Sequence, residues 1–284
     1  MLYVSFGLQK AGSTLTANLT RLILERGGHQ HISFSPEERA DRRRNGSLRV
    51  QGDQINNINH WLPEVVHRID QRVPAERIVL LRTHAAPDAT IKAVIRDGRA
   101  RCHLAIRDLR DIALSMLDVV DRRAQLGKAN SSAIRQGEVH STFPAIEADL
   151  TSLAQWDEIP GAIALDYEET AFRPPVSIAA ICRHLALDLP VEEYDSLFQQ
   201  AAANPSGKMN VAMPNRHRRE MSADDQAAFL SHFHDFYARY YPDAKVVAEA
   251  GQLRVEGYEA EREEKRRLKR EEKRKEKLAA KGKA

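Results

Sequence analysis

The 284-residue sequence contains only two cysteines, Cys102 and Cys182. Cys102 falls in a predicted strand and Cys182 in a predicted helix, so the count excludes a disulfide framework and favours a reducing compartment. Neither cysteine has a CxxC partner or a histidine at zinc-ligand spacing, which argues against a zinc site. We therefore expect a cytoplasmic protein whose two thiols belong to the core.

Long apolar segments are also lacking. No run of about 18 apolar residues is present, so the sequence offers no transmembrane segment. No basic-then-apolar leader is present, because the chain begins directly in a predicted strand. Both observations favour a cytoplasmic protein.

An excess of one charge is missing from most of the chain. The net charge is +3, but residues 256–284 carry 12 Lys/Arg and 8 Asp/Glu, which leaves 31 basic and 32 acidic residues elsewhere. Nucleic acid is therefore not an expected partner. The tail pairs opposite charges four residues apart, such as Glu261 and Lys265, without a heptad seam. We expect a domain over 1–255 and a solvated helical or disordered tail over 256–284. A contact of the tail with nucleic acid or an anionic membrane is the weaker alternative.

The informative stretch is the first dozen residues. An apolar, strand-like run ends at Gly7, a loop extends to Gly12, and helical periodicity begins at Leu15. Backbone N–H groups of such a loop, together with a helix N-terminus, form a cage for an anion. Nucleotide triphosphatase loops read G-x-x-x-x-G-K-[ST], but here Ser13 stands in the lysine position and the cation has moved to Lys10.

Short apolar strands alternate with helical segments along the chain. Strands are predicted at 2–6, 78–84, 102–108 and 162–165, and helices at 15–26, 61–73, 90–96, 109–123, 143–156, 174–187, 191–203 and 222–241, whereas 29–60 is polar and irregular. This order predicts an α/β fold of the P-loop type, a parallel sheet with helices on both faces. Ligands bind beyond the carboxyl ends of such strands, where Gly7, His84, Arg107 and Tyr167 fall.

Four segments together resemble the superfamily of sulfotransferases that use 3′-phosphoadenosine-5′-phosphosulfate (PAPS). The family's P-K-x-G-[ST]-[ST] loop is matched by residues 9–14, its K-[TS]-H strand end by Arg82-Thr83-His84, its R-[ND]-x-x-D-x-x-x-S block by Arg107, Asp111 and Ser115, and its Y-E-D stretch loosely by 167–169. The order and approximate spacing agree across residues 1–240.

The resemblance implies a role for each matched residue. Lys10 would contact the bridging oxygen and stabilise the leaving group, and His84 would be the general base. The 5′-phosphosulfate would be held by Ala11, Gly12, Ser13 and Thr14, and the adenine by Tyr167. The 3′-phosphate would be held by Arg107, Ser115 and one arginine of the basic segment 215–219, with Arg218 chosen and Arg216 and Arg219 as alternatives. No metal is required, because a transferring sulfuryl group carries less charge than a phosphoryl group.

Purely structural interpretations of the same residues remain open. Arg107 could pair with Asp111 four residues on, Ser115 could fill a packing gap, and Tyr167 could simply pack at a strand end. The sequence also departs from the family: Gln9 replaces the loop proline, Arg82 replaces a lysine, and Leu15 replaces an aromatic residue beside the adenine.

The acceptor is not specified by any motif. Aromatic residues make up 6% of the chain, and the candidate acceptor segment contains Arg39, Arg42, Arg43 and Arg44. This composition favours a small polar molecule or a glycan over a flat phenol. Two rival hypotheses remain: a P-loop small-molecule kinase, and a non-catalytic nucleotide-binding or interaction protein.

Overall fold

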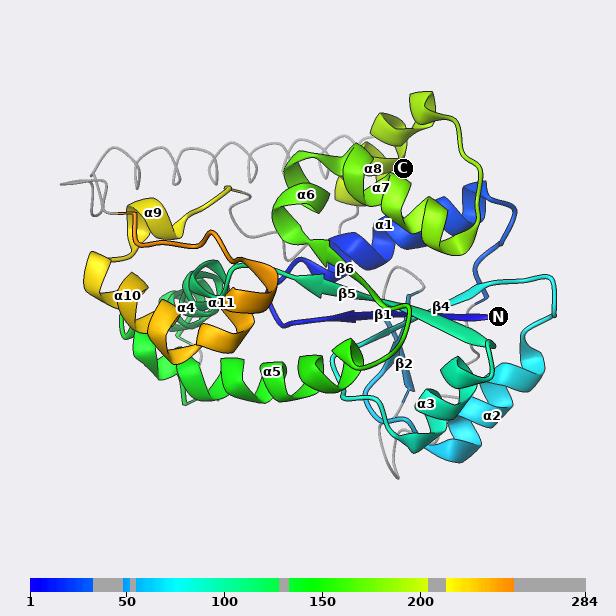
Figure 1. Cartoon of the computed structure of the whole chain (residues 1–284), viewed down its shortest axis with the longest axis horizontal. Helices are drawn as coiled ribbons and strands as arrows, with labels where there is room; N and C mark the ends of the chain where they lie inside the picture. The colour runs from blue at the N-terminus through cyan, green and yellow to red at the C-terminus, as the bar shows by residue number, and fades with distance from the viewer. Residues whose placement is uncertain (33–47, 52–54, 128–132, 204–212, 248–284) are drawn as a thin grey trace, which may run out of the picture. The chain divides into compact units, whose positions relative to one another are not determined.

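The computed structural model describes residues 1–32, 48–51, 55–127, 133–203 and 213–247 (Figure 1). The chain divides into two compact units, Met1–Asn210 and Val211–Ala284. The predicted tail, 256–284, and the arginines at 39–44 lie outside the described residues. The first unit contains the sheet and every strand-end residue that the sequence singles out.

The sheet has six strands in the order β2-β3-β4-β1-β5-β6. Their bounds are β1 Leu2–Gly7, β2 Leu48–Gln51, β3 Ile55–Ile58, β4 Val79–Thr83, β5 Ala100–Ile106 and β6 Ile163–Asp166. Five strands are parallel, and β2 pairs antiparallel with β3 at one edge. The predicted parallel α/β sheet is therefore confirmed, with an added antiparallel edge strand.

Helices cover both faces of this sheet (Figure 1). One face carries α1 Ser13–Arg26, α6 Tyr167–Phe172, α7 Pro174–Leu185 and α8 Tyr194–Ala203; the other carries α2 Pro63–Arg72, α3 Ala89–Arg96, α4 Leu109–Gln125 and α5 Phe143–Asp157. Two short 3-10 turns, η2 Val139–Thr142 and η3 Val191–Glu193, precede α5 and α8.

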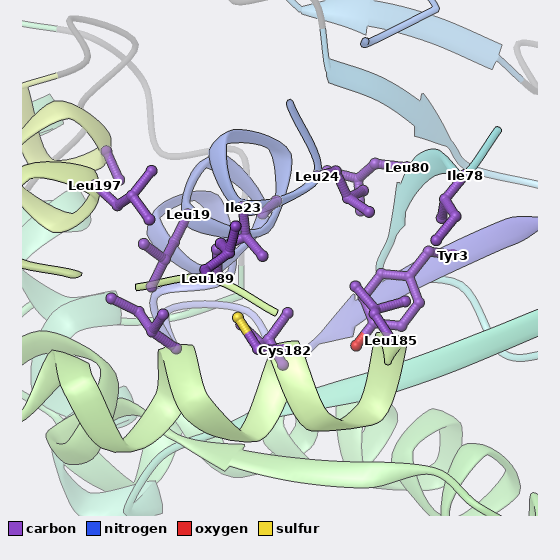
Figure 2. Close-up of a cluster of buried hydrophobic side chains, with 14 of the residues drawn as sticks. Tyr3, Leu19, Ile23, Leu24, Ile78, Leu80, Cys182, Leu185, Leu189 and Leu197 are labelled. Atoms are coloured by element: carbon purple, nitrogen blue, oxygen red, sulfur yellow. The ribbon is translucent and has the colours of Figure 1, made fainter. Parts of the chain in front are cut away.

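Each layer buries the apolar face that its sequence predicts. On the α1 face, a cluster centred on Tyr3, Ile23 and Leu80 joins β1, α1 and β4 to α7 and α8 (Figure 2). On the other face, the fully buried Trp156 of α5 stacks on Phe6 at 5.7 Å and meets Trp61 edge-on at 5.9 Å between ring centroids. These two cores hold the strands rigidly and so fix where their carboxyl ends lie.

The structure differs from the sequence-based expectation in the polar segment after α1. Residues 29–60 lack apolar periodicity, yet they contain β2 and β3. Asn56 in β3 is fully buried, and its Nδ2 donates to the Ile32 carbonyl at 2.8 Å. A tertiary hydrogen bond thus compensates for a polar side chain that would otherwise oppose burial in a strand.

The second unit is helical where it is described. It contains α9 His217–Glu220, α10 Ala223–His232 and α11 His234–Tyr240. Ser222 caps α10, because its Oγ accepts from the Asp225 N–H at 3.1 Å. The single helix predicted over 222–241 is two helices, separated at Phe233 where φ is −107° and ψ is 34°.

No helix in the described ranges is long and apolar enough to cross a membrane.

Candidate functional site: the carboxyl end of the sheet

The loop between β1 and α1 has the backbone of an anion-binding turn. Lys10 and Gly12 both have left-handed φ values, 68° and 74°. At Gly7 the loop passes so close to α1 that an added Cβ would lie 2.6 Å from Ser13 Cβ. Gly12 is the N-cap of α1 and leaves that helix without a side-chain cap. The N-terminus of α1 therefore presents its partial positive charge at the carboxyl end of β1.

Three N–H groups of this loop, those of Leu8, Gln9 and Ala11, already have partners within the protein. The Leu8 N–H donates to the Ala105 carbonyl at 3.1 Å. The Ala11 N–H donates to the Leu8 carbonyl at 3.2 Å, and Ala11 is fully buried. The Gln9 N–H donates to Asp149 Oδ2 at 2.8 Å. An anion would therefore meet the later N–H groups, from Gly12 onward, and the predicted contact with Ala11 stays a prediction.

Arg82, at the end of β4, links three segments around the loop. Its Nη2 donates to Ser13 Oγ at 2.8 Å and to His84 Nε2 at 3.0 Å, and its Nη1 donates to Asn57 Oδ1 at 3.1 Å. Arg82 is 8% exposed, and desolvation lowers its pKa to about 10. A buried guanidinium thus lies against the first residue of α1, the helix that follows the anion-binding loop.

The hydrogen bonds of His84 determine which tautomer it adopts. A backbone carbonyl can only accept, so Nδ1, which is 2.6 Å from the Gly7 oxygen, carries the proton. The guanidinium of Arg82 can only donate, so Nε2 presents a lone pair. His84 is therefore neutral and held on both sides, with its basic nitrogen toward Arg82.

The surroundings of His84 also oppose its protonation. The residue keeps solvent-exposed surface, yet desolvation and the positive charges of Arg82 and Lys10 lower its pKa to about 4, against the Gly7 carbonyl, which raises it. An imidazolium would have to place an N–H against the Arg82 guanidinium. In this geometry His84 can accept a proton at Nε2 only after Arg82 has been displaced from that nitrogen.

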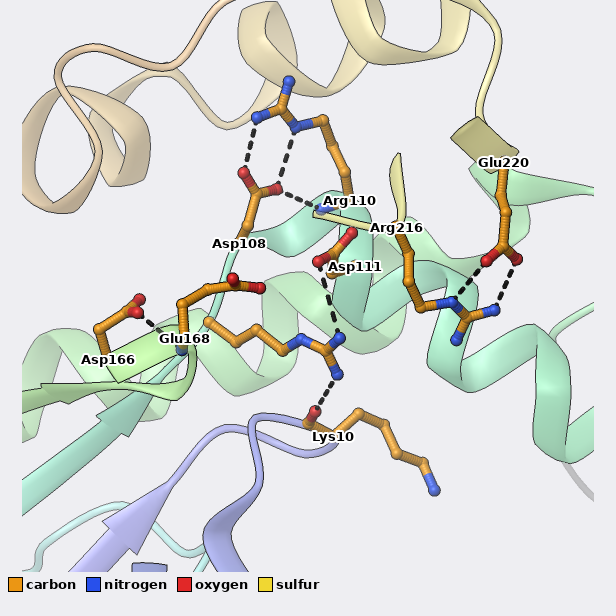
Figure 3. A network of polar contacts seen from close by, with 9 residues as sticks. Lys10, Asp108, Arg110, Asp111, Asp166, Glu168, Arg216 and Glu220 are labelled. Atoms are coloured by element: carbon orange, nitrogen blue, oxygen red, sulfur yellow. Dashed lines mark hydrogen bonds and ion pairs between the residues drawn. The ribbon is translucent and has the colours of Figure 1, made fainter. Parts of the chain in front are cut away.

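Arg107 follows β5 and braces the loop from the other side. Its Nη1 donates to the Lys10 carbonyl at 3.3 Å, and its Nη2 lies 3.6 Å from Asp111 Oδ2; the two contacts are drawn in Figure 3. The residue is 4% exposed. Within the described part of the chain, Arg107 Nε and Nη2 have no hydrogen-bond partner. The ion pair with Asp111 is therefore present, and it leaves guanidinium donors for a further acceptor.

Tyr167 is a support for the loop and for Arg107. The Arg107 Cζ atom lies 4.1 Å from the Tyr167 ring centroid. A Cβ added to Gly12 would lie 2.4 Å from Tyr167 Cδ2. Asp166, just before it, accepts from the Glu168 N–H at 2.7 Å and so caps α6. The predicted contact between Tyr167 and an adenine stays a prediction.

The remaining predicted residues differ in their position and burial. Ser115 is buried in α4, one turn after Asp111. Thr14 lies in the first turn of α1, and Leu15, in the position of the family's aromatic residue, packs against the core cluster of Figure 2. Arg218 is exposed on α9 in the second unit, where its neighbour Arg216 is buried and pairs with Glu220 at 2.7 Å (Figure 3). The predicted contact of Arg218 with the 3′-phosphate stays a prediction.

Two residues of the site were not among the predicted ones. Asn57 lies in the unpredicted strand β3, so no pattern marked it. Asp149 lies mid-helix in α5, 140 residues from the Gln9 that it binds. The replacement of the loop proline by Gln9 was the one signal, because it introduces an N–H and an amide that need acceptors.

No group of three or more His, Cys, Asp or Glu side chains within the described ranges could hold a metal ion.

Neither a protein-family model nor a curated protein matches this sequence. Among solved structures, a retinol dehydratase in complex with androsterone and the inactive cofactor PAP is 18% identical with a TM-score of 0.41, and mouse sulfotransferase SULT7A1 complexed with PAP is 12% identical with a TM-score of 0.43. Each match covers 70% of this chain and 63% of the other, less than two thirds of its length. An unliganded sugar kinase from Janibacter sp. HTCC2649 is 17% identical, with a TM-score of 0.35 over 67% of this chain and 96% of the kinase. At these TM-scores the likenesses are too distant to assign a family or an activity.

Proposed function

We propose that this protein transfers a sulfuryl group from PAPS to a hydroxyl or amine of a polar acceptor. The observation that carries the proposal is the pair of cationic positions around one loop. The N-terminus of α1 and Lys10 provide one, and the buried guanidinium of Arg107, bonded to the Lys10 carbonyl, provides the other. A nucleotide with anionic groups on both its 5′ and 3′ positions satisfies both.

The transfer step needs positioning and charge stabilisation more than covalent catalysis. The acceptor oxygen attacks sulfur and forms the new S–O bond. The bond to the bridging oxygen breaks, and adenosine 3′,5′-bisphosphate leaves with the electron pair. Lys10 stabilises the charge that develops on that oxygen, while Gly12, Ser13 and Thr14 hold the 5′ group at the start of α1.

His84 takes the proton of the acceptor in this proposal. Its Nε2 lone pair is held by Arg82 at 3.0 Å, so the acceptor hydroxyl must replace Arg82 at that nitrogen. Arg82 also contacts Ser13 at 2.8 Å and would pair with the phosphosulfate oxygens next to it. Moving that positive charge from the imidazole to an anion also raises the proton affinity of His84, in step with the attack.

The proposed acceptor is a polar small molecule or a glycan. His84 Nε2 meets the guanidinium of Arg82, which also binds Asn57, so polar side chains lie on this side of the proposed base. Such groups recognise hydroxyls and charged substituents by hydrogen bonds, whereas a flat phenol needs an apolar slot.

The first test is ligand choice, measured by thermal shift and calorimetry. We expect stabilisation by adenosine 3′,5′-bisphosphate, weaker stabilisation by adenosine 5′-monophosphate, and little by ATP or GTP with Mg²⁺. The 3′-phosphate preference should amount to about 10- to 150-fold in affinity, the worth of about 1.5–3 kcal/mol for a charge-assisted hydrogen bond. Stronger stabilisation by ATP with Mg²⁺ would favour the kinase alternative.

A single variant tests whether Arg107 is the residue that recognises the 3′-phosphate. Arg107→Ala should bind the bisphosphate and the monophosphate with similar affinity, whereas the control Arg101→Ala, on an exposed residue of β5, should keep the parent's preference. Transfer of label from [³⁵S]PAPS to a panel of sugars, amino sugars and phenols then identifies the acceptor class. If Arg107→Ala keeps the 3′-phosphate preference, this assignment is wrong.

A further inference from the structure

Helix α5 contacts both of the loops that carry the proposed catalytic residues. Near its middle, Asp149 accepts two hydrogen bonds from Gln9: from the backbone N–H at 2.8 Å and from Nε2 at 3.2 Å. Near its end, the indole Nε1 of Trp156 donates to the Ala85 carbonyl at 2.8 Å. Gln9 precedes Lys10, and Ala85 follows His84.

The two contacts stand two helical turns apart on one helix. Seven residues separate Asp149 from Trp156, so the helix sets their spacing at about 10.5 Å along its axis, from a rise of 1.5 Å per residue. Trp156 is fully buried between Phe6 and Trp61, and Leu153 and Ile146 of α5 are buried as well. The core therefore fixes the position of α5 independently of the two loops.

The contact at Gln9 bears on the conformation of Lys10. A lysine with φ of 68° occupies a region that side chains with a Cβ seldom adopt, and such conformations persist only where the surroundings fix them. Asp149 holds the residue before Lys10, and Arg107 holds the Lys10 carbonyl at 3.3 Å. The Lys10 backbone is thus fixed from both sides, by Asp149 of α5 and by Arg107, which follows β5.

A carboxylate is the matching group for this contact. The Gln9 N–H and the Gln9 amide both donate, and Asp149 supplies one oxygen to each. Burial raises the pKa of Asp149, and the two hydrogen bonds from Gln9 oppose that rise by stabilising the charged form. An asparagine could accept one of the two bonds but would turn its own NH₂ toward the second donor.

We propose that α5 is a brace that fixes the separation of Lys10 and His84, and that Asp149 is the positioning residue through which the brace holds the loop. The proposal rests on the proposed function for its effect on turnover, while its effect on the loop is independent of the reaction. Asp149 acts through Gln9 and Lys10 and itself contacts no reacting atom.

The first experiment is a double-mutant cycle on sulfuryl transfer. Asp149→Ala should lower kcat about 10- to 100-fold, the size expected when a reacting group is misplaced by about 1 Å. In a Lys10→Ala background the same change should lower kcat by less than about 2-fold, because the group being positioned is already gone. Asp149→Asn should fall between Asp149→Ala and the parent. Equal losses in both backgrounds, or no loss in the parent, would overturn the proposal.

The second experiment does not depend on the reaction. Amide hydrogen exchange of the full chain should be faster across residues 7–14 in Asp149→Ala, and by a smaller factor in Gln9→Ala, which keeps the backbone N–H bond to Asp149. It should be unchanged in Glu147→Ala, which removes an exposed carboxylate from the same helix. If the parent neither binds adenosine 3′,5′-bisphosphate nor transfers sulfate, the proposed function fails and this exchange decides the brace alone. Unchanged exchange over 7–14 in both variants would overturn the brace even in an active enzyme.

Discussion

His84 and His103 both have a lowered pKa, but their surroundings differ. His84 follows β4 at the carboxyl end of the sheet, between the Gly7 carbonyl and the guanidinium of Arg82. His103 lies within β5, is fully buried, and packs its ring 5.3 Å from that of Tyr3, with Nδ1 3.2 Å from the Tyr3 hydroxyl. One histidine borders an anion-binding loop and the other belongs to a core.

The causes of the two pKa values show why the shift alone is a poor guide to function. Desolvation by burial lowers the pKa of His103 to about 3, with a smaller contribution from His184. The pKa of His84, about 4, also reflects the charges of Arg82 and Lys10, which an anionic ligand would change. A low pKa that a ligand can reverse suits a base, whereas one set by packing suits a structural residue.

The sharpest test of this comparison is turnover in single variants. His84→Ala should lower kcat about 10²- to 10⁴-fold, or about 3–5 kcal/mol of barrier, because a positioned general base is lost. Affinity for adenosine 3′,5′-bisphosphate should change little, since Lys10, Ser13 and Arg107 remain. The measurement is sulfuryl transfer at saturating PAPS, alongside calorimetric binding. His103→Gln, which can still hydrogen-bond to Tyr3, is the matched control and should keep near-parental kcat.

If His84→Ala keeps its turnover, His84 has no place in the mechanism. If the variant instead loses bisphosphate binding, the residue acts structurally through its contact with Gly7.

A second test asks whether the pKa values of His84 and His103 have different causes. Arg82→Met should raise the pKa of His84 from about 4 toward 6.5, because it removes both a positive charge and the donor that holds Nε2. The pKa should stay below 6.5, since desolvation, the largest cause, persists. Arg82→Lys keeps the charge and should give a smaller rise. The measurement is an NMR titration of the imidazole Cε1–H signals, in which His103 serves as an internal reference.

An unchanged pKa of His84 in Arg82→Met would mean that desolvation, and not the charge of Arg82, dominates its value, as desolvation does for His103. Displacement of Arg82 by the acceptor hydroxyl would then not raise the proton affinity of His84.

Much of this site could be predicted from local sequence, because its residues follow strands. Apolar runs that end at Gly7, Arg82-Thr83-His84 and Arg107 identify strand ends, and parallel strands bring those ends to one edge. The structure places Lys10, Ser13, His84 and Arg107 at that edge through contacts among Gly7, Lys10, Ser13 and Arg82. The spacing of the apolar runs along the chain indicates the order of strands and helices, and that order favours a parallel sheet.

Hydrogen bonds between residues far apart in the sequence could not be predicted. Nothing near Gln9 indicates that Asp149, 140 residues later, accepts its two donors. The segment Ile55–Ile58 has two asparagines in the middle, which hides a strand whose buried Asn56 is satisfied by the Ile32 carbonyl. The tautomer of His84 likewise depends on two partners from different strand ends. Each of these features is set by tertiary hydrogen bonds, which leave no local pattern.

The smallest expected effect concerns His103 and acid stability. The folded protein keeps His103 neutral down to about pH 3, whereas the unfolded chain protonates it below about pH 6.5. The unfolded state therefore binds more protons between these values, and the free energy of unfolding falls as the pH falls. One proton corresponds to about 1.4 kcal/mol per pH unit. Other histidines with lowered pKa values, such as His31 and His184, add to the parent's slope.

The contribution of His103 is isolated by comparing two proteins in the same titration. Urea unfolding at pH 7, 6 and 5 should show that the parent loses stability faster than His103→Gln, with a slope that differs by about 1.4 kcal/mol per pH unit below pH 6. His103→Gln removes the titrating group, so its own acid dependence comes from the remaining histidines. The variant's stability at pH 7 is irrelevant to the comparison, because only the slopes are compared. Parallel slopes would mean that His103 becomes protonated within the folded core, and its contrast with His84 would then disappear.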